Sequence, residues 1–384
     1  MNNIPARKPK IALMSYAMDN RPGMGTALYT RRLIEYLLLD DRFEWYLVHY
    51  DKVDDPLYTK AHEILMPRLS LPLGTRFVRQ LLFFWRYRKM DFDIIHWFQP
   101  RLYPFFWLAP GRNFVATLFA AGDVTAPGAF PPSRRMFNFV LRHFNKKLDA
   151  IIASSQFGKG EIQECYGAAP ERVFVTYLGG GERFRTMPRE KAKEKVRERF
   201  GITGGFILDV SRLEPHKNVG TLIKAYTIAR DKGVRHKLVL VGKNSGNYET
   251  LRALATSLGY GDDIFFMTYA TDEELNALYA GADLFVFPSL NEGFGLPLVE
   301  AMSMGVPIIT SNTTALPEVI GDAGITIDPL NVDQIADEIH RLLSDQKLLG
   351  ELIERGLRRA RTFTWGETAK QTIRIYDTLL RKMN

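Results

Sequence analysis

Two glutamates eight positions apart, Glu292 and Glu300, flank a Gly-Phe-Gly turn in the segment 291–300 (NEGFGLPLVE). The segment follows the apolar run Leu284 to Phe287, which predicts a buried strand, and Pro297 suits the first turn of a helix. A glycine turn between a strand and a helix brings free backbone amides close to a ligand. This pattern predicts a site for a phosphorylated ligand, in which the glutamates accept hydrogen bonds from sugar hydroxyls. The alternative is that both are solvated acids near a helix start.

A basic pair occupies the segment 211–218 (SRLEPHKN), directly after the apolar run Phe206 to Val210. Arg212 offers a planar fork for phosphate oxygens and Lys217 a mobile point charge, a combination suited to a diphosphate leaving group. Open α/β sheets bind ligands at the carboxyl ends of their strands, where both residues fall. The alternative, a solvated basic turn, would be usual for either residue alone.

A glycine turn also follows the first predicted strand, in the segment 21–26 (RPGMGT). A short glycine turn is weak evidence by itself. Its position adds weight, because the first loop of a two-domain arrangement would face the cleft opposite the loops of Arg212 and Glu292.

Apolar runs that read as strands alternate with stretches that read as helices. The predicted strands are Lys10 to Tyr16, Trp45 to His49, Asp93 to Trp97, Asn113 to Leu118, Ala150 to Ser154 and Val173 to Thr176, then Phe206 to Val210, Lys237 to Val241, Ile264 to Met267, Leu284 to Phe287, Pro307 to Thr310 and Gly324 to Ile327. Near-continuous apolar strands separated by helices predict buried parallel sheets. The predicted fold class is therefore α/β, with two Rossmann-like domains facing a cleft.

The length of 384 residues exceeds what one hydrophobic core comfortably serves. We predict an N-terminal acceptor-side domain over 1–182, a donor-binding domain over 183–362, and a C-terminal helix over 363–384 that crosses between the domains. The glycine-rich segment 178–188 is the predicted hinge.

Composition restricts the function classes. The single cysteine, Cys165, excludes an internal disulfide and a cysteine-rich metal site, and favours a cytoplasmic setting. No signal peptide or membrane-spanning run is evident. Through Gly180 the chain holds 24 Lys and Arg against 16 Asp and Glu, whereas the remainder holds 27 of each, so the net charge of +8 lies in the first half. No nucleic-acid-reading motif accompanies it, and an anionic membrane surface fits as a partner.

Two stretches of the first half mix aromatic and basic residues, Thr75 to Lys89 and Met136 to Lys147. Such helices suit peripheral attachment to an anionic bilayer, here the inner face of the plasma membrane. The alternative is that they pack on the first sheet.

A metal site for a nucleotide sugar would need an Asp-x-Asp triplet at the carboxyl end of a strand. The triplet Asp91-Phe92-Asp93 instead precedes its strand. We therefore expect neither a metal nor a cofactor, because Arg212, Lys217 and helix dipoles can stabilise a departing diphosphate.

In combination these motifs resemble glycosyltransferase family 4. The resemblance rests on the segments 211–218, 283–289 (DLFVFPS), 292–300 and the turn 305–307 (GVP), strongly over about 204–328 and loosely before that. It implies a retaining glycosyltransferase of the GT-B fold.

The resemblance also implies residue roles. Arg212 and Lys217 would hold the donor diphosphate, Glu300 the ribose hydroxyls, and Glu292 the donor sugar. Backbone amides would support the sugar and phosphates at Gly293, Phe294, Gly295 and Leu296, and Gly25 would border the diphosphate from the other domain.

The chain departs from the family on the acceptor side. Phe119 stands where the usual histidine would fall. Asp123 is the first replacement candidate, and His96 is a second, although single histidines of this kind are more often structural.

The predicted reaction is transfer of a hexose, with retained configuration, to a hydroxyl of a glycan or lipid-linked acceptor in cell-surface polysaccharide or glycolipid synthesis. GDP-mannose is the leading donor candidate by family frequency. Two alternatives stay open: a nucleotide-sugar isomerase or hydrolase of the same fold, and a non-catalytic nucleotide-sugar-binding protein.

Overall fold

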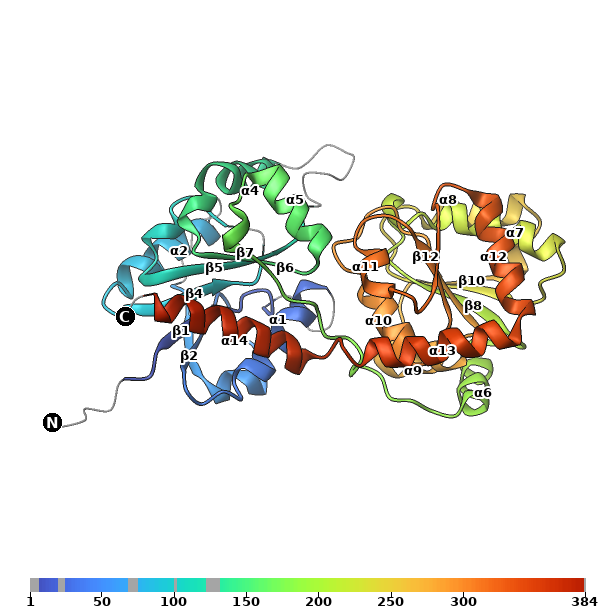
Figure 1. Ribbon diagram of the computed structural model, residues 1–384, viewed down its shortest axis with the longest axis horizontal. Helices are drawn as coiled ribbons and strands as arrows, with labels where there is room; N and C mark the ends of the chain where they lie inside the picture. Colours follow the sequence, from blue (N-terminus) through green and yellow to red (C-terminus); the bar gives the residue numbers. More distant parts are fainter. Residues whose placement is uncertain (1–6, 20–24, 68–74, 100–101, 122–131, 383–384) are drawn as a thin grey trace. The chain divides into compact units, whose positions relative to one another are not determined.

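The computed structural model describes residues 7–19, 25–67, 75–99, 102–121 and 132–382. The chain forms two compact units, each built around its own sheet (Figure 1). Unit 1 comprises Met1–Leu178 and Trp365–Asn384, and unit 2 comprises Gly179–Thr364. The chain leaves unit 1 within the segment 178–188, which the sequence marks as a hinge.

Unit 1 contains a seven-stranded parallel sheet in the order β3-β2-β1-β4-β5-β6-β7. Its strands are β1 Lys10–Met14, β2 Glu44–His49, β3 His62–Leu65, β4 Phe92–Trp97, β5 Gly111–Phe119, β6 Ala150–Ala153 and β7 Val173–Val175. Its helices are α1 Thr26–Leu37, η1 Pro56–Lys60, α2 Thr75–Arg86, η2 Phe106–Leu108, α4 Pro132–Phe144, η3 Asn145–Lys147, α5 Gln156–Tyr166, η4 Pro170–Arg172 and α14 Trp365–Arg381.

Helices cover both faces of this sheet, with α4 and α5 on one side and α1 and α14 on the other (Figure 1). Because both faces are covered, the central strands β1 and β4 are buried over almost their whole length. The predicted strands of this unit are all present, with ends that differ by up to two residues.

Unit 2 contains a six-stranded parallel sheet in the order β10-β9-β8-β11-β12-β13. Its strands are β8 Phe206–Val210, β9 Lys237–Val241, β10 Ile264–Met267, β11 Leu284–Phe287, β12 Ile308–Ser311 and β13 Ile325–Ile327. Its helices are α6 Arg189–Phe200, η5 Pro215–Lys217, α7 Val219–Asp231, α8 Tyr248–Ser257, η6 Gly261–Asp263, α9 Asp272–Gly281, α10 Leu296–Ser303, α11 Leu316–Ile320, α12 Val332–Ser344 and α13 Gln346–Ala360.

The strand order of unit 2 reverses between β8 and β11. These strands pair directly, with Ile207 beside Leu284 and Leu208 beside Phe285. The loops that carry the predicted basic pair and the predicted glutamates therefore leave neighbouring strands at the switch point of the sheet, where open α/β sheets bind ligands.

The C-terminal helix α14 returns to unit 1 and packs against α1. Its Tyr376 is fully buried, and the tyrosine hydroxyl lies 2.6 Å from Nδ1 of His96 in β4. Trp365, at the start of the helix, contacts Tyr29 of α1 with 5.9 Å between ring centroids. The buried face of α14 is formed by large residues at helical spacing, among them Trp365, Tyr376 and Leu379.

Candidate donor site

Backbone and side-chain hydrogen bonds join the loop after β8 to the loop after β11. The carbonyl of His216 accepts from the Leu290 amide at 2.7 Å and from the Ser289 hydroxyl at 3.1 Å. The Asn218 side chain donates to the carbonyls of Pro288, at 3.1 Å, and Pro329, at 2.7 Å. The two predicted motifs are thus parts of one local structure.

Lys217 and Glu292 meet in this structure as an ion pair, with the lysine ammonium donating to the Oε1 of Glu292. Their side chains are 15% and 13% exposed. Lys217 also lies 5.5 Å from the ring centroid of Phe287, at the end of β11. The sequence predicts that both residues serve the donor, and the structure places them in direct contact.

Arg212 has a different environment. Its side chain is 55% exposed and pairs with Glu214 of its own loop at 2.8 Å. Gly242, which follows β9, packs closely against the backbone of this loop at Ser211. A Cβ built on Gly242 would lie 1.6 Å from the carbonyl oxygen of Ser211, so only glycine fits there.

Gly295 caps the N-terminus of α10 with a positive φ of 95°. This conformation favours glycine, and a Cβ there would also come within 2.7 Å of Leu316. Beside it, Phe294 is buried and contacts Phe363 with 5.6 Å between ring centroids. Leu296 and Pro297 begin the helix, where Pro297 has no amide hydrogen and the Leu298 amide donates to the Gly295 carbonyl at 2.9 Å.

Glu300 lies inside α10 and is buried, in contrast to Glu292. Its Oε1 accepts from Arg183 at 2.7 Å, and its Oε2 accepts from the hydroxyl of Tyr279 at 2.9 Å. Arg183 also donates to Asp272 at 2.7 Å. Burial raises the pKa of Glu300 above its ordinary value, although Arg183 and Tyr279 act to lower it. Sequence reasoning missed Arg183 and Tyr279, which carry no motif that relates them to Glu300.

Asp209, inside β8, is a further acidic side chain that sequence reasoning missed. It is fully buried, and its Oδ1 accepts from the Ser211 hydroxyl at 2.6 Å. Burial raises the pKa of Asp209 to about 7. A signal was present in the sequence, because an aspartate interrupts the otherwise apolar run FILDV.

In unit 1, Gly25 forms the N-cap of α1 with a φ of 56°. Asp123 lies outside the described residues. His96 is fully buried, and its Nε2 lies 2.9 Å from the Thr117 hydroxyl while Nδ1 faces Tyr376. Burial lowers the pKa of His96 to about 3, so the ring is neutral. This geometry favours the structural alternative for His96, which ties β4 to β5 and to α14.

Phe119 ends β5 in the left-handed region, with a φ of 63°. The pairing register with β6 shifts between Thr117 and Phe119. The carbonyl of Phe119 accepts from the amide of Ser154 at 2.9 Å. The position where the family's usual histidine would fall is therefore a bulged strand end.

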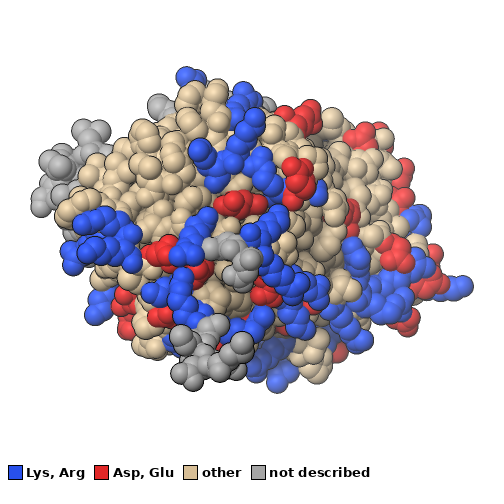
Figure 2. All heavy atoms as spheres, turned by 60° about the vertical axis from the view of Figure 1, so that its left-hand side comes forward, with Lys and Arg blue, Asp and Glu red and all other residues tan. Residues whose placement is uncertain are grey.

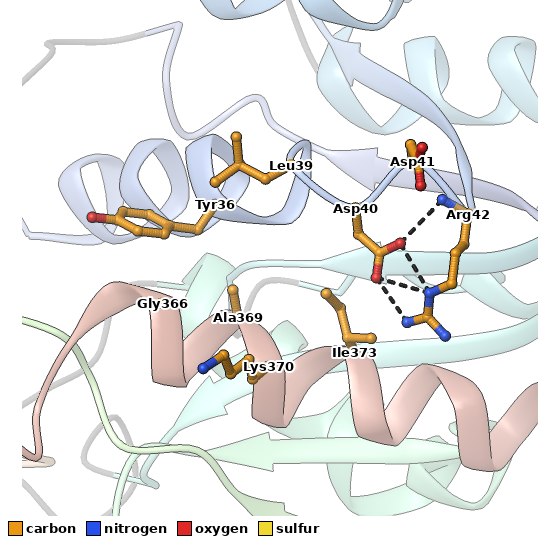
Figure 3. A pocket seen from close by; sticks show the side chains of 9 residues that line it. All are labelled: Tyr36, Leu39, Asp40, Asp41, Arg42, Gly366, Ala369, Lys370 and Ile373. Carbon is orange, nitrogen blue, oxygen red and sulfur yellow. Dashed lines mark hydrogen bonds and ion pairs between the residues drawn. The ribbon is translucent and has the colours of Figure 1, made fainter.

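Two hollows contain none of the predicted site residues. One of about 460 Å³ lies in unit 1 between α1 and α14, with Tyr36, Arg42 and Lys370 among its lining side chains (Figure 3). The other, of about 510 Å³, lies in unit 2 beside α8 and β10. Neither coincides with the strand switch point of unit 2.

The triplet 91–93 lies at the amino end of β4, as predicted, although Phe92 and Asp93 belong to the strand itself. Asp93 accepts from Arg7 at 3.0 Å, and Asp91 pairs with Arg112. Within the described residues, no group of three His, Cys, Asp or Glu side chains is arranged to hold a metal ion.

In the part of the chain that the structure describes, every helix is too short or too polar to cross a bilayer.

Comparison with known proteins agrees with this architecture. Residues 25–179 match the family model described as Glycosyltransferase Family 4, and residues 190–359 match the one described as Glycosyl transferases group 1. The O-antigen chain mannosyltransferase B of Escherichia coli is 32% identical over 332 residues, which cover 84% of this chain and 81% of that protein. The serotype-specific mannosyltransferase WbdA of Escherichia coli is 34% identical over 65% of this chain and 31% of that protein.

A solved structure shares the fold at low identity. Anabaena Alr3699/HepE in complex with UDP and glucose superposes with a TM-score of 0.74 at 21% identity, over 96% of this chain and 100% of that chain. The fold class predicted from the sequence, two Rossmann-like α/β units of the GT-B type, is confirmed. The chain has the architecture of a glycosyltransferase. It belongs to glycosyltransferase family 4.

Proposed function

We propose that this glycosyltransferase moves a hexose from a nucleotide diphosphate sugar to a hydroxyl of a glycan or lipid-linked acceptor, with retention of the anomeric configuration. The observation that carries the proposal is the half-buried Lys217–Glu292 pair at the carboxyl ends of β8 and β11. A movable cation and a carboxylate in this position suit a ligand that contains both a diphosphate and a sugar.

Donor binding would rearrange this pair. The diphosphate attracts Lys217 away from Glu292, and the exposed Arg212 adds a planar fork for phosphate oxygens. Glu292 is then free to accept hydrogen bonds from the sugar. Amides of 293–296, at the N-terminus of α10, complete the set of donors to the sugar and phosphates.

Glu300 would meet the ribose hydroxyls. Two of its lone-pair positions are taken by Arg183 and Tyr279, and an ionised carboxylate has about four. The two remaining positions suit the two hydroxyls of a ribose, while Arg183 and Tyr279 keep the carboxylate oriented.

In the transfer step, the bond between the anomeric carbon and the diphosphate oxygen breaks, and the acceptor oxygen bonds to the anomeric carbon on the same face. The acceptor proton passes to the departing phosphate. Arg212, Lys217 and the α10 N-terminus stabilise the negative charge that develops on the leaving group. We propose that these groups take the place of a metal ion, so that turnover persists in the presence of a chelator.

Mannose is the proposed hexose and GDP-mannose the proposed donor. The support is that two relatives of this chain are described as mannosyltransferases, one of the O-antigen chain. The O-antigen relative supports a place in cell-surface polysaccharide or lipopolysaccharide synthesis. We propose that the protein acts on the cytoplasmic side of the membrane.

The decisive measurement is donor turnover with and without an acceptor. Mannosyl transfer to a polysaccharide or lipid-linked acceptor, with retained configuration in an anomeric NMR assay, supports the proposal. Donor consumption that is independent of acceptor would identify a hydrolase or isomerase. Saturable donor binding with no turnover would identify a binding protein.

A further inference from the structure

Asp209 occupies an unusual position for a carboxylate. It is the fourth residue of β8, its exposed fraction is 0%, and its Oδ1 accepts from the Ser211 hydroxyl at 2.6 Å. Its Oδ2 is buried and has no hydrogen-bond partner among the described residues. Buried polar atoms nearly always have a partner, so an orphaned carboxylate oxygen beside a ligand site calls for an explanation.

Two charged side chains act on Asp209 from neighbouring elements, Lys217 in η5 and Glu292 in the loop after β11. The charge of Asp209 in turn acts on Tyr279 in α9. Lys217 and Glu292 form the ion pair of the donor site, and Tyr279 holds Glu300. Asp209 thus interacts electrostatically with groups at both donor-site glutamates.

The charged form of Asp209 is costly in this position. A buried carboxylate with one unpaired oxygen loses its hydration without replacement, which favours the protonated form. Burial raises the pKa of Asp209 to about 7, while the Ser211 hydrogen bond and the Lys217 charge act to lower it and Glu292 acts to raise it. The side chain can therefore gain or lose its proton close to neutral pH.

We propose that Asp209 is a positioning residue of the donor site, and that its protonated form is the one that releases Lys217 to the donor diphosphate. An ionised Asp209 adds a second carboxylate that attracts Lys217 and repels the diphosphate. A neutral Asp209 leaves Glu292 as the single competitor. The inference rests on the proposed function, because it assigns the diphosphate to Lys217.

The first test measures the binding of GDP-mannose, without acceptor, as a function of pH. The parent protein should bind with constant affinity below the pKa of Asp209 and lose about tenfold in affinity per pH unit above it. Asp209→Asn mimics the neutral acid and should keep the low-pH affinity at alkaline pH. Ser211→Ala removes a hydrogen bond that favours the ionised form, so the loss should begin at a higher pH than in the parent.

The second test needs no ligand. Because the pKa of Asp209 is raised in the fold, its ionisation destabilises the native state progressively as pH rises from about 4 to about 7, and the penalty is complete above that. The melting temperature of Asp209→Asn relative to the parent should therefore rise between about pH 4 and pH 7 and then level off.

The outcomes separate the two proposals. If GDP-mannose binds with the predicted pH dependence but no acceptor receives mannose, the proposed transfer is wrong and the role of Asp209 stands. If the parent and Asp209→Asn show the same pH dependence of binding, the role of Asp209 is wrong whatever the turnover. A constant difference in melting temperature across pH would likewise show that Asp209 does not titrate near neutrality.

Discussion

Glu292 and Glu300 belong to one short motif, yet their side chains are held in opposite ways. Glu292 is paired with a lysine whose four-carbon chain can reach another partner, whereas Glu300 is buried and fixed by Arg183 and Tyr279. The environment of Glu292 suits a side chain that exchanges its lysine partner for the donor sugar. The environment of Glu300 suits a side chain that orients a ribose without moving.

Lys217→Ala should lower donor turnover by about 10² to 10³, since loss of one donor to a developing oxyanion costs about 2 to 4 kcal/mol. The measurement is kcat/KM for GDP-mannose under acceptor saturation. Lys224→Ala is the matched control, because Lys224 is an exposed lysine in α7 of the same unit. Turnover of Lys217→Ala within a few fold of the parent would show that the diphosphate is held elsewhere.

Arg183→Ala should destabilise unit 2 by about 3 to 5 kcal/mol at neutral pH, because it leaves the buried Glu300 without its cation. The burial that raises the pKa of Glu300 would then act with less opposition. The ionised form becomes more costly, so stability should be lost as pH rises through the pKa of Glu300 and regained in acid.

Denaturant unfolding of Arg183→Ala at neutral pH and at about pH 5 measures this effect. Tyr279→Phe serves for comparison, since it removes one neutral hydrogen bond and should cost about 0.5 to 1.5 kcal/mol. An Arg183→Ala penalty that does not shrink in acid would mean that the lost packing, and not the charge, dominates.

At the scale of elements, the loop after β8 depends on the close approach of Gly242 to Ser211. Gly242→Ala must displace that loop, so we expect a loss of stability of about 1 to 3 kcal/mol together with weaker donor binding. Gly220→Ala is the control, because Gly220 lies in α7 with its nearest neighbour 3.7 Å from an added Cβ. It should leave stability equal or slightly higher. Equal losses of stability and donor binding in Gly242→Ala and Gly220→Ala would show that the contact of Gly242 with Ser211 has no special role.

The apolar runs of the sequence were sufficient to predict the strands of both sheets, because strands buried on both faces need apolar residues throughout. The exception is β3, a short edge strand in which only Ile64 is buried, so its sequence lacks the pattern. The sequence also assigns Lys217 and Glu292 to one site, since both loops follow the carboxyl ends of predicted strands. Their direct contact was not predicted, because it depends on the pairing of β8 with β11.

The environment of Glu300 could not be predicted in the same way. Arg183 and Tyr279 lie 117 and 21 positions from Glu300 in the chain. Their contacts depend on the packing of α9 and α10 and on the segment that enters unit 2. Side-chain partners of this kind follow from tertiary structure and leave no spacing that local periodicity can detect.

At the scale of the whole molecule, the charge excess predicts peripheral binding to anionic membranes. Unit 1 exposes Trp85 in α2, Phe105 and Leu108 at η2, and Phe139 in α4. The face in Figure 2 carries many Lys and Arg side chains and fewer Asp and Glu. Aromatic side chains flanked by basic ones suit a lipid interface, and salt should weaken their binding. Trp85 and Phe139 are exposed and do not pack on the sheet. Their exposure favours membrane attachment over the alternative that both helices only pack on the first sheet.

Cosedimentation with vesicles tests this prediction. Binding should require anionic lipid, fall as salt is raised, and decrease in a Trp85→Ala, Phe139→Ala double variant. Tyr269→Ala is the control, because Tyr269 is an exposed aromatic residue of unit 2. Equal binding to neutral vesicles would contradict the electrostatic part of the prediction.

The return of α14 to unit 1 also affects how the chain folds as it is made. Unit 2 is continuous in sequence, so its strands and helices leave the ribosome in one uninterrupted stretch. Domains generally fold as units during synthesis. The folding of unit 1 cannot be completed until the end of the chain is made, because the contact of His96 with Tyr376 joins residues 280 positions apart. Its nascent sheet therefore lacks α14, one of the helices that cover it, until unit 2 has been synthesised. A chaperone that protects exposed apolar surface would act on the first half of the nascent chain, and translation stalled before residue 365 would leave that half incomplete while the second half is folded.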